Sequence, residues 1–249
     1  MRMLAVILAL LVSGAADAAE INALISTALK AATDELLPSV ERAHGHAIRA
    51  SYGPSGALIP RFNAGQPADV FLTDSAAIDE LIRQGKVVPG RSDLARTGIG
   101  IAVRKGAPKP DVSSPEALKQ ALLAARSVGH AAPAGGSITA PHIMRMFEQL
   151  GIAAEMAPKV RLAAGGPNGR VSVLISSGEA EIGLQQVSEL MSNPDVEVIG
   201  MLPPELQQVT TYSAGIATSA KEPDAARVLI HFLAAPDAIA IYKLRGLML

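Results

Sequence analysis

The stretch of sequence that decides the fold is YGPSGALIPRFNAGQPADVFLTD, residues 52–74. It opens with a Gly-Pro-Ser-Gly turn, continues into a helix with apolar residues at Leu58, Ile59 and Phe62, and ends in a short apolar strand. The backbone N–H groups at the start of a helix lack partners, and the helix dipole favours negative charge there. Ser55 can add a hydroxyl donor, and Gly56 lets the backbone approach a ligand closely. The stretch therefore predicts an anion site, although a serine at this place can also serve only as a helix cap.

The rest of the chain continues the same alternation of strand and helix. Strands are expected at residues 20–25, 47–51, 68–72, 98–103, 127–131, 159–162, 181–185, 196–201 and 209–216. Helices are expected at residues 27–44, 56–64, 75–83, 115–125, 139–151, 168–177, 187–191 and 223–234. Strands and helices that alternate with short connections predict an α/β fold in which helices cover both faces of the sheets.

Two proline-containing breaks divide the chain. The first is RKGAPKP at residues 104–110, and the second is LPP at residues 202–204. A chain that enters a second lobe and returns would cross at these places. We therefore expect one lobe from residues 20–103 and 205–249 and another from residues 104–204. The ligand is expected in the cleft between the lobes, which closes by hinge motion.

The N-terminal residues have the three parts of a secretory signal peptide. Arg2 precedes an apolar run that ends in small residues, with cleavage expected after Ala18 or Ala19. Residues 1–19 are therefore interpreted as a signal peptide, and the mature protein is expected in the periplasm. A buried N-terminal strand or a retained anchor is the alternative.

The composition excludes several classes of function. The chain has 249 residues, a formal net charge of −1 and 49% hydrophobic residues, enough for a sizeable core in one or two compact units. The absence of cysteine rules out disulfides, thiolate catalysis and cysteine-ligated zinc. A near-neutral charge with 3% aromatic residues argues against a nucleic-acid-binding surface. A bound anion would be held mainly by neutral donors.

The chain resembles the periplasmic molybdate-binding proteins of ABC transporters over essentially its whole mature length. The run AGQPADVF at residues 64–71 carries the resemblance most strongly, and GEAEIG at 178–183 and PDAAR at 223–227 support it. The resemblance implies a two-lobe periplasmic binding-protein fold of type II, with mixed sheets flanked by helices. It also implies a small anionic solute, molybdate or tungstate, and a membrane permease as partner. No cofactor or metal is expected, and we expect a monomer.

The same resemblance implies the ligand-binding residues. Hydroxyls from two loops of the first lobe match Ser26 and Ser55, beside the amide of Gly56. Helix starts in the second lobe place further donors near Ser137, Thr139, Asn168 and Gly169. The complete set of expected ligand-binding residues is Ser26, Ser55, Gly56, Ser137, Thr139, Asn168, Gly169, Arg170 and Gln186.

Three residues depart from the family pattern. Gln186 stands where the family usually has a tyrosine, and a glutamine can both donate and accept hydrogen bonds. Asp74 would repel a dianion unless it caps the following helix, which we expect it to do. Arg170 could bind a carboxylate in a bidentate way, although it could also be a solvated surface residue. A small organic carboxylate is therefore the alternative ligand to a molybdate-like oxyanion.

An enzyme of the hydrolase class is the alternative of another kind. The Gly53-Pro54-Ser55-Gly56 turn is not the serine nucleophile motif, because its second glycine comes one position early. A nucleophile also needs an adjacent base, and no histidine has a context that suggests this role. We therefore expect a solute-binding protein of an ABC importer and no catalysis.

Overall fold

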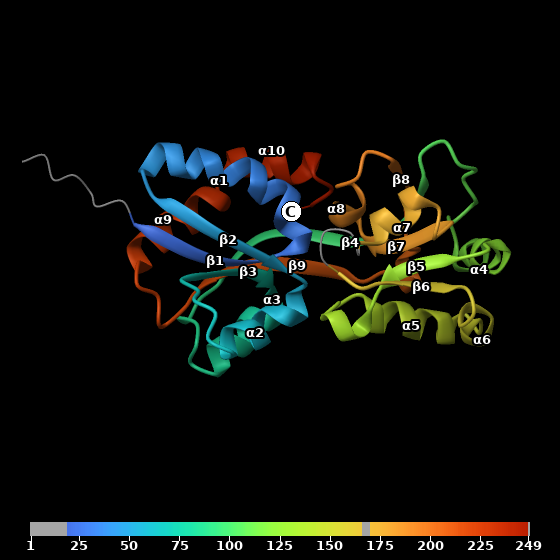
Figure 1. The fold of residues 1–249 in the computed structure, drawn as a ribbon, viewed down its shortest axis with the longest axis horizontal. Coiled ribbons are helices and arrows are strands. Elements are labelled where there is room, and N and C mark those ends of the chain that lie inside the picture. The colour runs from blue at the N-terminus through green and yellow to red at the C-terminus, as the bar shows by residue number, and fades with distance from the viewer. Residues whose placement is uncertain (1–18, 166–169, 249) are drawn as a thin grey trace, which may run out of the picture.

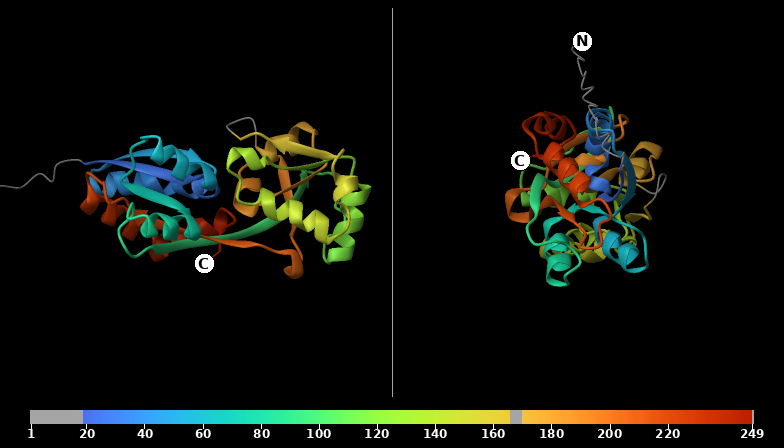
Figure 2. Two further views of the ribbon diagram at one scale, coloured as in Figure 1. Left: turned by 90° about the horizontal axis from the view of Figure 1, so that it is seen from below. Right: turned by 90° about the vertical axis from the view of Figure 1, so that its left-hand side faces the viewer.

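The computed structural model describes residues 19–165 and 170–248 of the chain. Figure 1 shows two lobes that lie side by side, each a sheet with helices around it. Two strands connect the lobes, β4 (Ser92–Arg104) and β9 (Val209–Ile216), and Figure 2 shows how they run from one lobe toward the other. The expected two-lobe α/β fold is thereby confirmed.

The first lobe contains the N-terminal strands and the C-terminal helices. Its sheet has the order β2-β1-β3-β9-β4, with β1 parallel to β2 and β3, and β9 antiparallel to β3 and β4. The new elements are β1 (Glu20–Ser26), η1 (Thr27–Leu29), α1 (Lys30–His44), β2 (Ala47–Gly53), α2 (Ser55–Asn63), β3 (Val70–Asp74), α3 (Ser75–Arg83), α9 (Pro223–Leu233) and α10 (Pro236–Leu244).

Each face of this first sheet has its own apolar core. Ile21, Leu29 and Leu229 belong to the core under α1, α9 and α10, and Leu24 and Phe71 belong to the core under α2 and α3. Neighbouring strand residues point to opposite faces, so the buried strand β1 needs apolar residues at consecutive positions.

The second lobe is built around the remaining strands. β4 continues into this sheet, where it is antiparallel to β7 and β8, while β5 is parallel to β6 and β7. The elements are α4 (Pro115–Ala124), β5 (Val128–Ala131), η2 (Pro133–Gly135), α5 (Ala140–Gln149), α6 (Ala153–Met156), β6 (Val160–Ala163), α7 (Val171–Ser177), β7 (Ile182–Gln186), α8 (Val187–Leu190), β8 (Val196–Met201) and η3 (Pro204–Leu206). Both sheets are mixed, as expected from the family resemblance.

The first crossing between the lobes differs from the expected one. β4 pairs with β9 as far as Gly98 and with β7 from Ile99 onward, so the chain changes lobes inside a strand. The side chain of Gln207 accepts a hydrogen bond from the Ile99 amide at 2.8 Å and donates one to the Ile99 carbonyl at 3.1 Å. The crossing therefore precedes the proline-rich residues 104–110, because hydrogen bonding continues along β4 through the lobe junction. The chain returns between β8 and β9, and Leu202 and Leu206 on either side of the two prolines both belong to the apolar core of the second lobe.

Two helices begin at a capping side chain. Asp74 caps α3 by accepting a hydrogen bond from the Ala77 amide at 3.0 Å, and Ser114 caps α4 in the same way.

Helix α10 and the first half of β4 were missing from the sequence prediction. Within the described residues, no single helix is long and apolar enough to span a membrane; α9 and α10 reach that length together but are bent by 63°.

Candidate functional site

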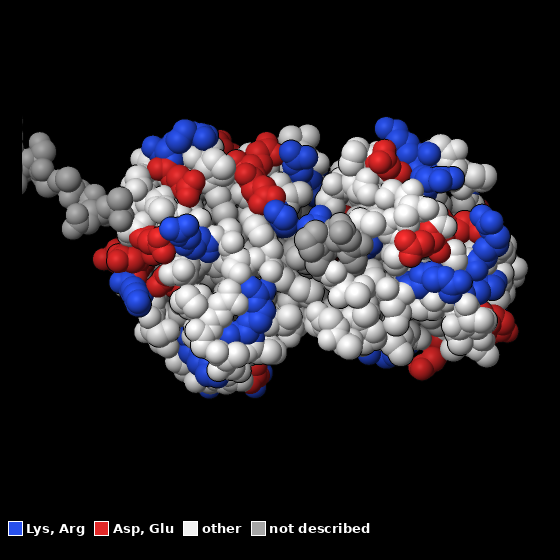
Figure 3. All heavy atoms as spheres, viewed as in Figure 1, with Lys and Arg blue, Asp and Glu red and all other residues white. Residues whose placement is uncertain are grey.

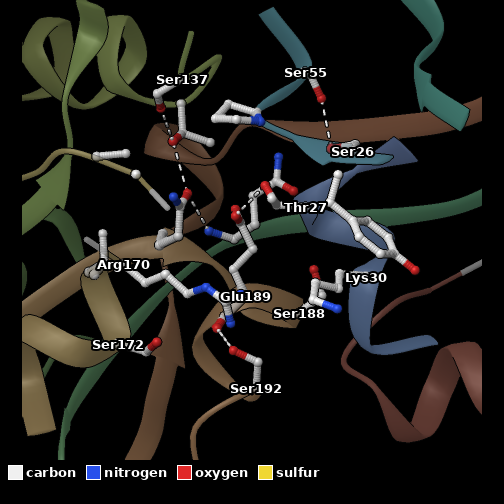
Figure 4. Close-up of a pocket in the computed structure, with 18 of the residues that line it drawn as sticks. Ser26, Thr27, Lys30, Ser55, Ser137, Arg170, Ser172, Ser188, Glu189 and Ser192 are labelled. Carbon is white, nitrogen blue, oxygen red and sulfur yellow. Dashed lines mark hydrogen bonds between the residues drawn. The ribbon is translucent and has the colours of Figure 1, made fainter. Parts of the chain in front are cut away.

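A cavity of about 630 Å³ lies between the two lobes. It is lined by the ends of β1 and β2 in the first lobe and by residues after β5 and β7 in the second. Ligands of α/β proteins bind at such carboxyl ends of strands, where loops present side chains and amides. Figure 3 shows the waist between the lobes at which the cavity lies, and Figure 4 shows its lining side chains. We treat this cleft as the candidate site.

Two predicted serines meet on the first-lobe wall. The hydroxyl oxygens of Ser26 and Ser55 are 2.9 Å apart, and the two residues are only 1% and 4% exposed. Ser26 also accepts a hydrogen bond from the Ala28 amide at 3.4 Å. Only one of the two hydroxyl protons is used in the mutual hydrogen bond, so the other can be donated to a ligand. The pair is brought together from residues 29 positions apart in the chain.

The amide of Gly56 has a partner in the opposite lobe. It donates a hydrogen bond to the carbonyl of Gly136 at 3.0 Å, so the start of α2 touches the second lobe directly. A Cβ atom added at Gly56 would lie 2.8 Å from the Gly136 oxygen, and one added at Gly136 would lie 2.7 Å from the Ala57 nitrogen. The two glycines therefore permit a close backbone contact between the lobes. This contact occupies a donor that we had expected to face the ligand.

The second-lobe wall carries a chain of polar side chains. The hydroxyls of Ser137 and Thr139 are 3.1 Å apart, and Thr139 donates to Oε1 of Gln185 at 3.0 Å. Ser137 accepts a hydrogen bond from the Ala140 amide at 3.2 Å and so caps α5, whereas Thr139 makes no capping bond. Thr139 leaves the capping of α5 to Ser137, and its hydroxyl is turned toward Gln185.

Gln186 is held by strand β9. Its Oε1 accepts a hydrogen bond from the Tyr212 hydroxyl at 2.6 Å, and its Nε2 donates to Thr210 at 3.3 Å. Burial raises the pKa of the Tyr212 phenol, the nearby Glu189 raises it further, and Gln186 opposes the shift. Tyr212 therefore stays a neutral donor. A tyrosine hydroxyl thus lines the cleft, but it comes from a strand that the sequence prediction did not connect with the site.

A charged group between the lobes was also missed. Glu189, in α8, accepts a hydrogen bond at Oε1 from the Thr27 hydroxyl in the first lobe at 2.9 Å. Burial raises the pKa of this carboxyl, while the Thr27 hydrogen bond and the positive charge of Arg170 oppose the rise. Protein atoms surround Glu189, although the cleft leaves part of its side chain open to solvent. Figure 4 shows Arg170 extending from the start of α7 toward Glu189.

Lys30 and Asp34 lie at the first-lobe side of the cleft. The Lys30 ammonium is 2.5 Å from the Asp34 carboxylate and 4.2 Å from the centre of the Tyr52 ring. Asp34 also accepts a hydrogen bond from the Tyr52 hydroxyl at 2.7 Å. The charge of Lys30 is thus largely balanced by Asp34, and Arg245 pairs with Glu35. Among the described residues that line the cleft, Arg170 is the cation without a carboxylate at ion-pair distance.

The family of bacterial extracellular solute-binding proteins matches residues 21–247. The chain belongs to this family. The aconitate isomerase of a Pseudomonas species is 34% identical over 220 residues, which cover 86% of this chain and 81% of that protein. The molybdate-binding protein ModA of Azotobacter vinelandii is 26% identical over 244 residues, which cover 95% and 92% of the two chains.

A solved structure supports the fold. The periplasmic molybdate-binding protein of Azotobacter vinelandii superimposes with a TM-score of 0.74, covering 92% of this chain and 99% of that one at 20% identity. The resemblance to the periplasmic molybdate-binding proteins is therefore confirmed for family and fold. Because the relatives include a protein named as an enzyme, membership of the family does not by itself define the ligand.

The predicted residues of this solute-binding protein have different positions in the cleft. Ser26, Ser55, Ser137, Thr139, Arg170 and Gln186 all line the cavity. Gly56 contacts the opposite lobe, and Asn168 and Gly169 lie outside the described residues. Glu189, Thr27 and Tyr212 were not predicted. Glu189 could have been noticed in the sequence as an acidic residue that comes shortly after the expected strand at residues 181–185.

Proposed function

We propose that the cleft binds a small organic polycarboxylate. The observation that carries this proposal is that Arg170 lines the cavity near Glu189 without forming a close ion pair with it. A guanidinium matches the geometry of a carboxylate.

The size of the cavity supports the same ligand class. A volume of about 630 Å³ lies within the usual range for organic ligands, and its walls offer hydroxyl and amide groups on both lobes. A tetrahedral oxyanion would need only the region around one hydroxyl pair. The relative named aconitate isomerase is a second support, because aconitate is a tricarboxylate.

A thermal-shift panel tests this proposal. Purified protein is heated with trans-aconitate, citrate, succinate, sulfate, tungstate or molybdate. A ligand present at 100 times its dissociation constant stabilises the fold by about 2.7 kcal/mol, which is a clear shift in melting temperature. We expect the polycarboxylates to shift the melting temperature. A shift with molybdate and tungstate alone would replace the proposal by the oxyanion alternative.

Catalysis on the bound carboxylate is the second candidate function. It is favoured by Glu189, a carboxyl group with a raised pKa that lies in the cleft beside Arg170. The relative named as an isomerase supports this candidate, which is the alternative to the expected non-catalytic solute-binding protein. Incubation of the protein with cis-aconitate, followed by chromatography for trans-aconitate, tests it.

The proposed location and partner follow from the family. Residues 1–19 would direct export, and the mature chain would deliver its ligand to a membrane permease. Residues 1–18 are outside the described part of the chain, so the role of this segment rests on the sequence. Mass spectrometry of protein exported by a bacterial host tests it, with an N-terminus at Ala19 or Glu20 as the expected result.

A further inference from the structure

Glu189 has the geometry of a group that can reach a ligand between the lobes. Its Oε1 is held by Thr27 from across the cleft at 2.9 Å, and no described residue donates a hydrogen bond to its Oε2. The side chain lines the cavity and keeps part of its surface open to it. One oxygen is therefore oriented by the protein, while the other can face a ligand.

The other ionisable groups that line the cleft are less suited to accept a proton. Asp34 is engaged by both Lys30 and the Tyr52 hydroxyl. The pKa values of Tyr52 and Tyr212 are raised, chiefly by burial, which keeps their phenols protonated and therefore unable to accept a proton. Among the described residues that line the cavity there is no histidine. Glu189 is left as the carboxyl group available for proton transfer.

The surroundings of Glu189 suit such a role. Burial makes its carboxylate a stronger base than an exposed glutamate, and a general base works best with a pKa near the operating pH. The titratable groups that line the cleft with it are Arg170 from the start of α7, Tyr212 from β9, and Lys30, Asp34, Tyr52 and Arg245 on the first-lobe side. Of these, Arg170 acts on the carboxyl directly, in the direction that keeps it ionised.

We propose that Glu189 is a catalytic residue that moves a proton between two carbons of a bound unsaturated polycarboxylate. The Glu189 carboxylate removes a proton from a methylene carbon next to the ligand's C=C bond. The electrons of that C–H bond form a new C=C bond, and the former double bond is protonated at its far carbon by the same carboxyl group. No atom or electron is gained or lost, and the product is the isomer with a shifted double bond.

Arg170 has a defined part in this step. Negative charge that leaves the methylene carbon spreads onto the neighbouring carboxylate of the ligand. A guanidinium at that carboxylate stabilises the charge as it develops, which is the usual source of electrostatic catalysis. The Thr27–Glu189 hydrogen bond joins the two lobes, so the catalytic carboxyl is oriented when the cleft is closed. This inference rests on the proposed polycarboxylate ligand.

Proton NMR in D₂O tests the inference with the full mature chain and trans-aconitate as probe. Wild-type protein should exchange the methylene protons for deuterium and form the cis isomer. Glu189→Gln should keep the ligand-induced melting shift and lose at least about 100-fold in exchange rate, the usual range for a general base. Glu148→Gln is the matched control, because Glu148 is an exposed glutamate on α5 of the same lobe. It should behave as wild type.

A second variant separates catalysis from a structural role. Thr27→Val removes a hydrogen bond that lowers the Glu189 pKa, so the pH at which exchange is half-maximal should move upward. A residue needed only for folding would leave this midpoint unchanged. If Glu189→Gln does not fold, an unshifted midpoint in Thr27→Val overturns the inference.

The remaining outcomes distinguish the inference from the proposed function. Polycarboxylates that stabilise wild type without any exchange would overturn the role of Glu189 and leave the ligand class standing. Exchange at the wild-type rate in Glu189→Gln would do the same. A melting temperature that no polycarboxylate shifts would overturn the ligand class and the inference together.

Discussion

The two lobes contribute different chemistry to the cleft. The first lobe presents the neutral Ser26–Ser55 pair, and its charged residues Lys30 and Asp34 largely cancel. The second lobe presents Arg170 and Glu189, whose charges are not balanced by a close ion pair between the described atoms. We therefore expect the first lobe to accept many anions and the second lobe to select among them. Three predictions, given in order of decreasing size, test this division of roles between the two lobes.

The largest effect is expected for Arg170→Gln. If the second lobe supplies the charge that binds a carboxylate, its loss should cost about 2–5 kcal/mol of binding free energy, or roughly 30-fold or more in affinity. Isothermal titration with the polycarboxylate that gives the largest melting shift measures the change. Arg126→Gln is the control, because the Arg126 side chain is 90% exposed in the same lobe. Equal affinities for the two variants would contradict the division between the lobes.

A smaller effect is expected for Gly56→Ala, which tests the contact between the lobes. The added Cβ would lie 2.8 Å from the Gly136 oxygen, so the closed arrangement would be disfavoured. Ligand affinity should fall about tenfold, because the closed form that binds is less populated. The first lobe should not be destabilised, since alanine favours helix α2 over glycine.

Gly135→Ala is the matched control for the closure contact. A Cβ at Gly135 would lie 3.5 Å from the Ala164 oxygen, an ordinary contact. Small-angle X-ray scattering with and without ligand measures closure in both variants. A ligand-bound Gly56→Ala protein as compact as wild type would contradict the role of this glycine pair.

The smallest effect is expected for the pH dependence of stability. The folded-state pKa of Glu189 is raised by burial, so ionising it costs more in the folded protein than in the unfolded chain. The free energy of unfolding should therefore fall as the pH rises from the ordinary glutamate pKa, about 4.3, through the raised pKa of Glu189. Glu189→Gln should lack this fall. Urea unfolding midpoints across this pH range, with Glu148→Gln as control, measure it, and parallel profiles for wild type and Glu189→Gln would contradict the assignment.

Most helices and strands could be predicted from patterns of neighbouring residues. Helix α3 and strands β8 and β9 begin and end at the predicted residues, since their caps and apolar periodicity are properties of neighbouring residues. The first half of β4 was missed because its buried and exposed positions follow no simple alternation, and a register shift interrupts its pairing with β9. Helix α10 was missed because it follows α9 after a break of two residues.

The candidate site was less predictable than the fold. The Ser26–Ser55 pair could be expected, because Ser26 ends β1, Ser55 comes shortly after β2, and these parallel strands end at the same edge of the sheet. The role of Gln186 could not, because Tyr212 and Thr210, which hold its side chain, lie on a strand more than 20 residues away. Pairing between distant strands has no signature in the local sequence.

The sequence alone was enough to predict the alternation of strands and helices, the two-lobe family and the two serine hydroxyls of the first lobe. Only the tertiary structure decided that Thr27 meets Glu189, 162 residues away, and that Gly56 meets Gly136. The physical reason is that the features predicted from the sequence depend on neighbouring residues and on one sheet edge. The contacts between the lobes depend on how two lobes with separate apolar cores close on each other, which brings together residues that share no local pattern.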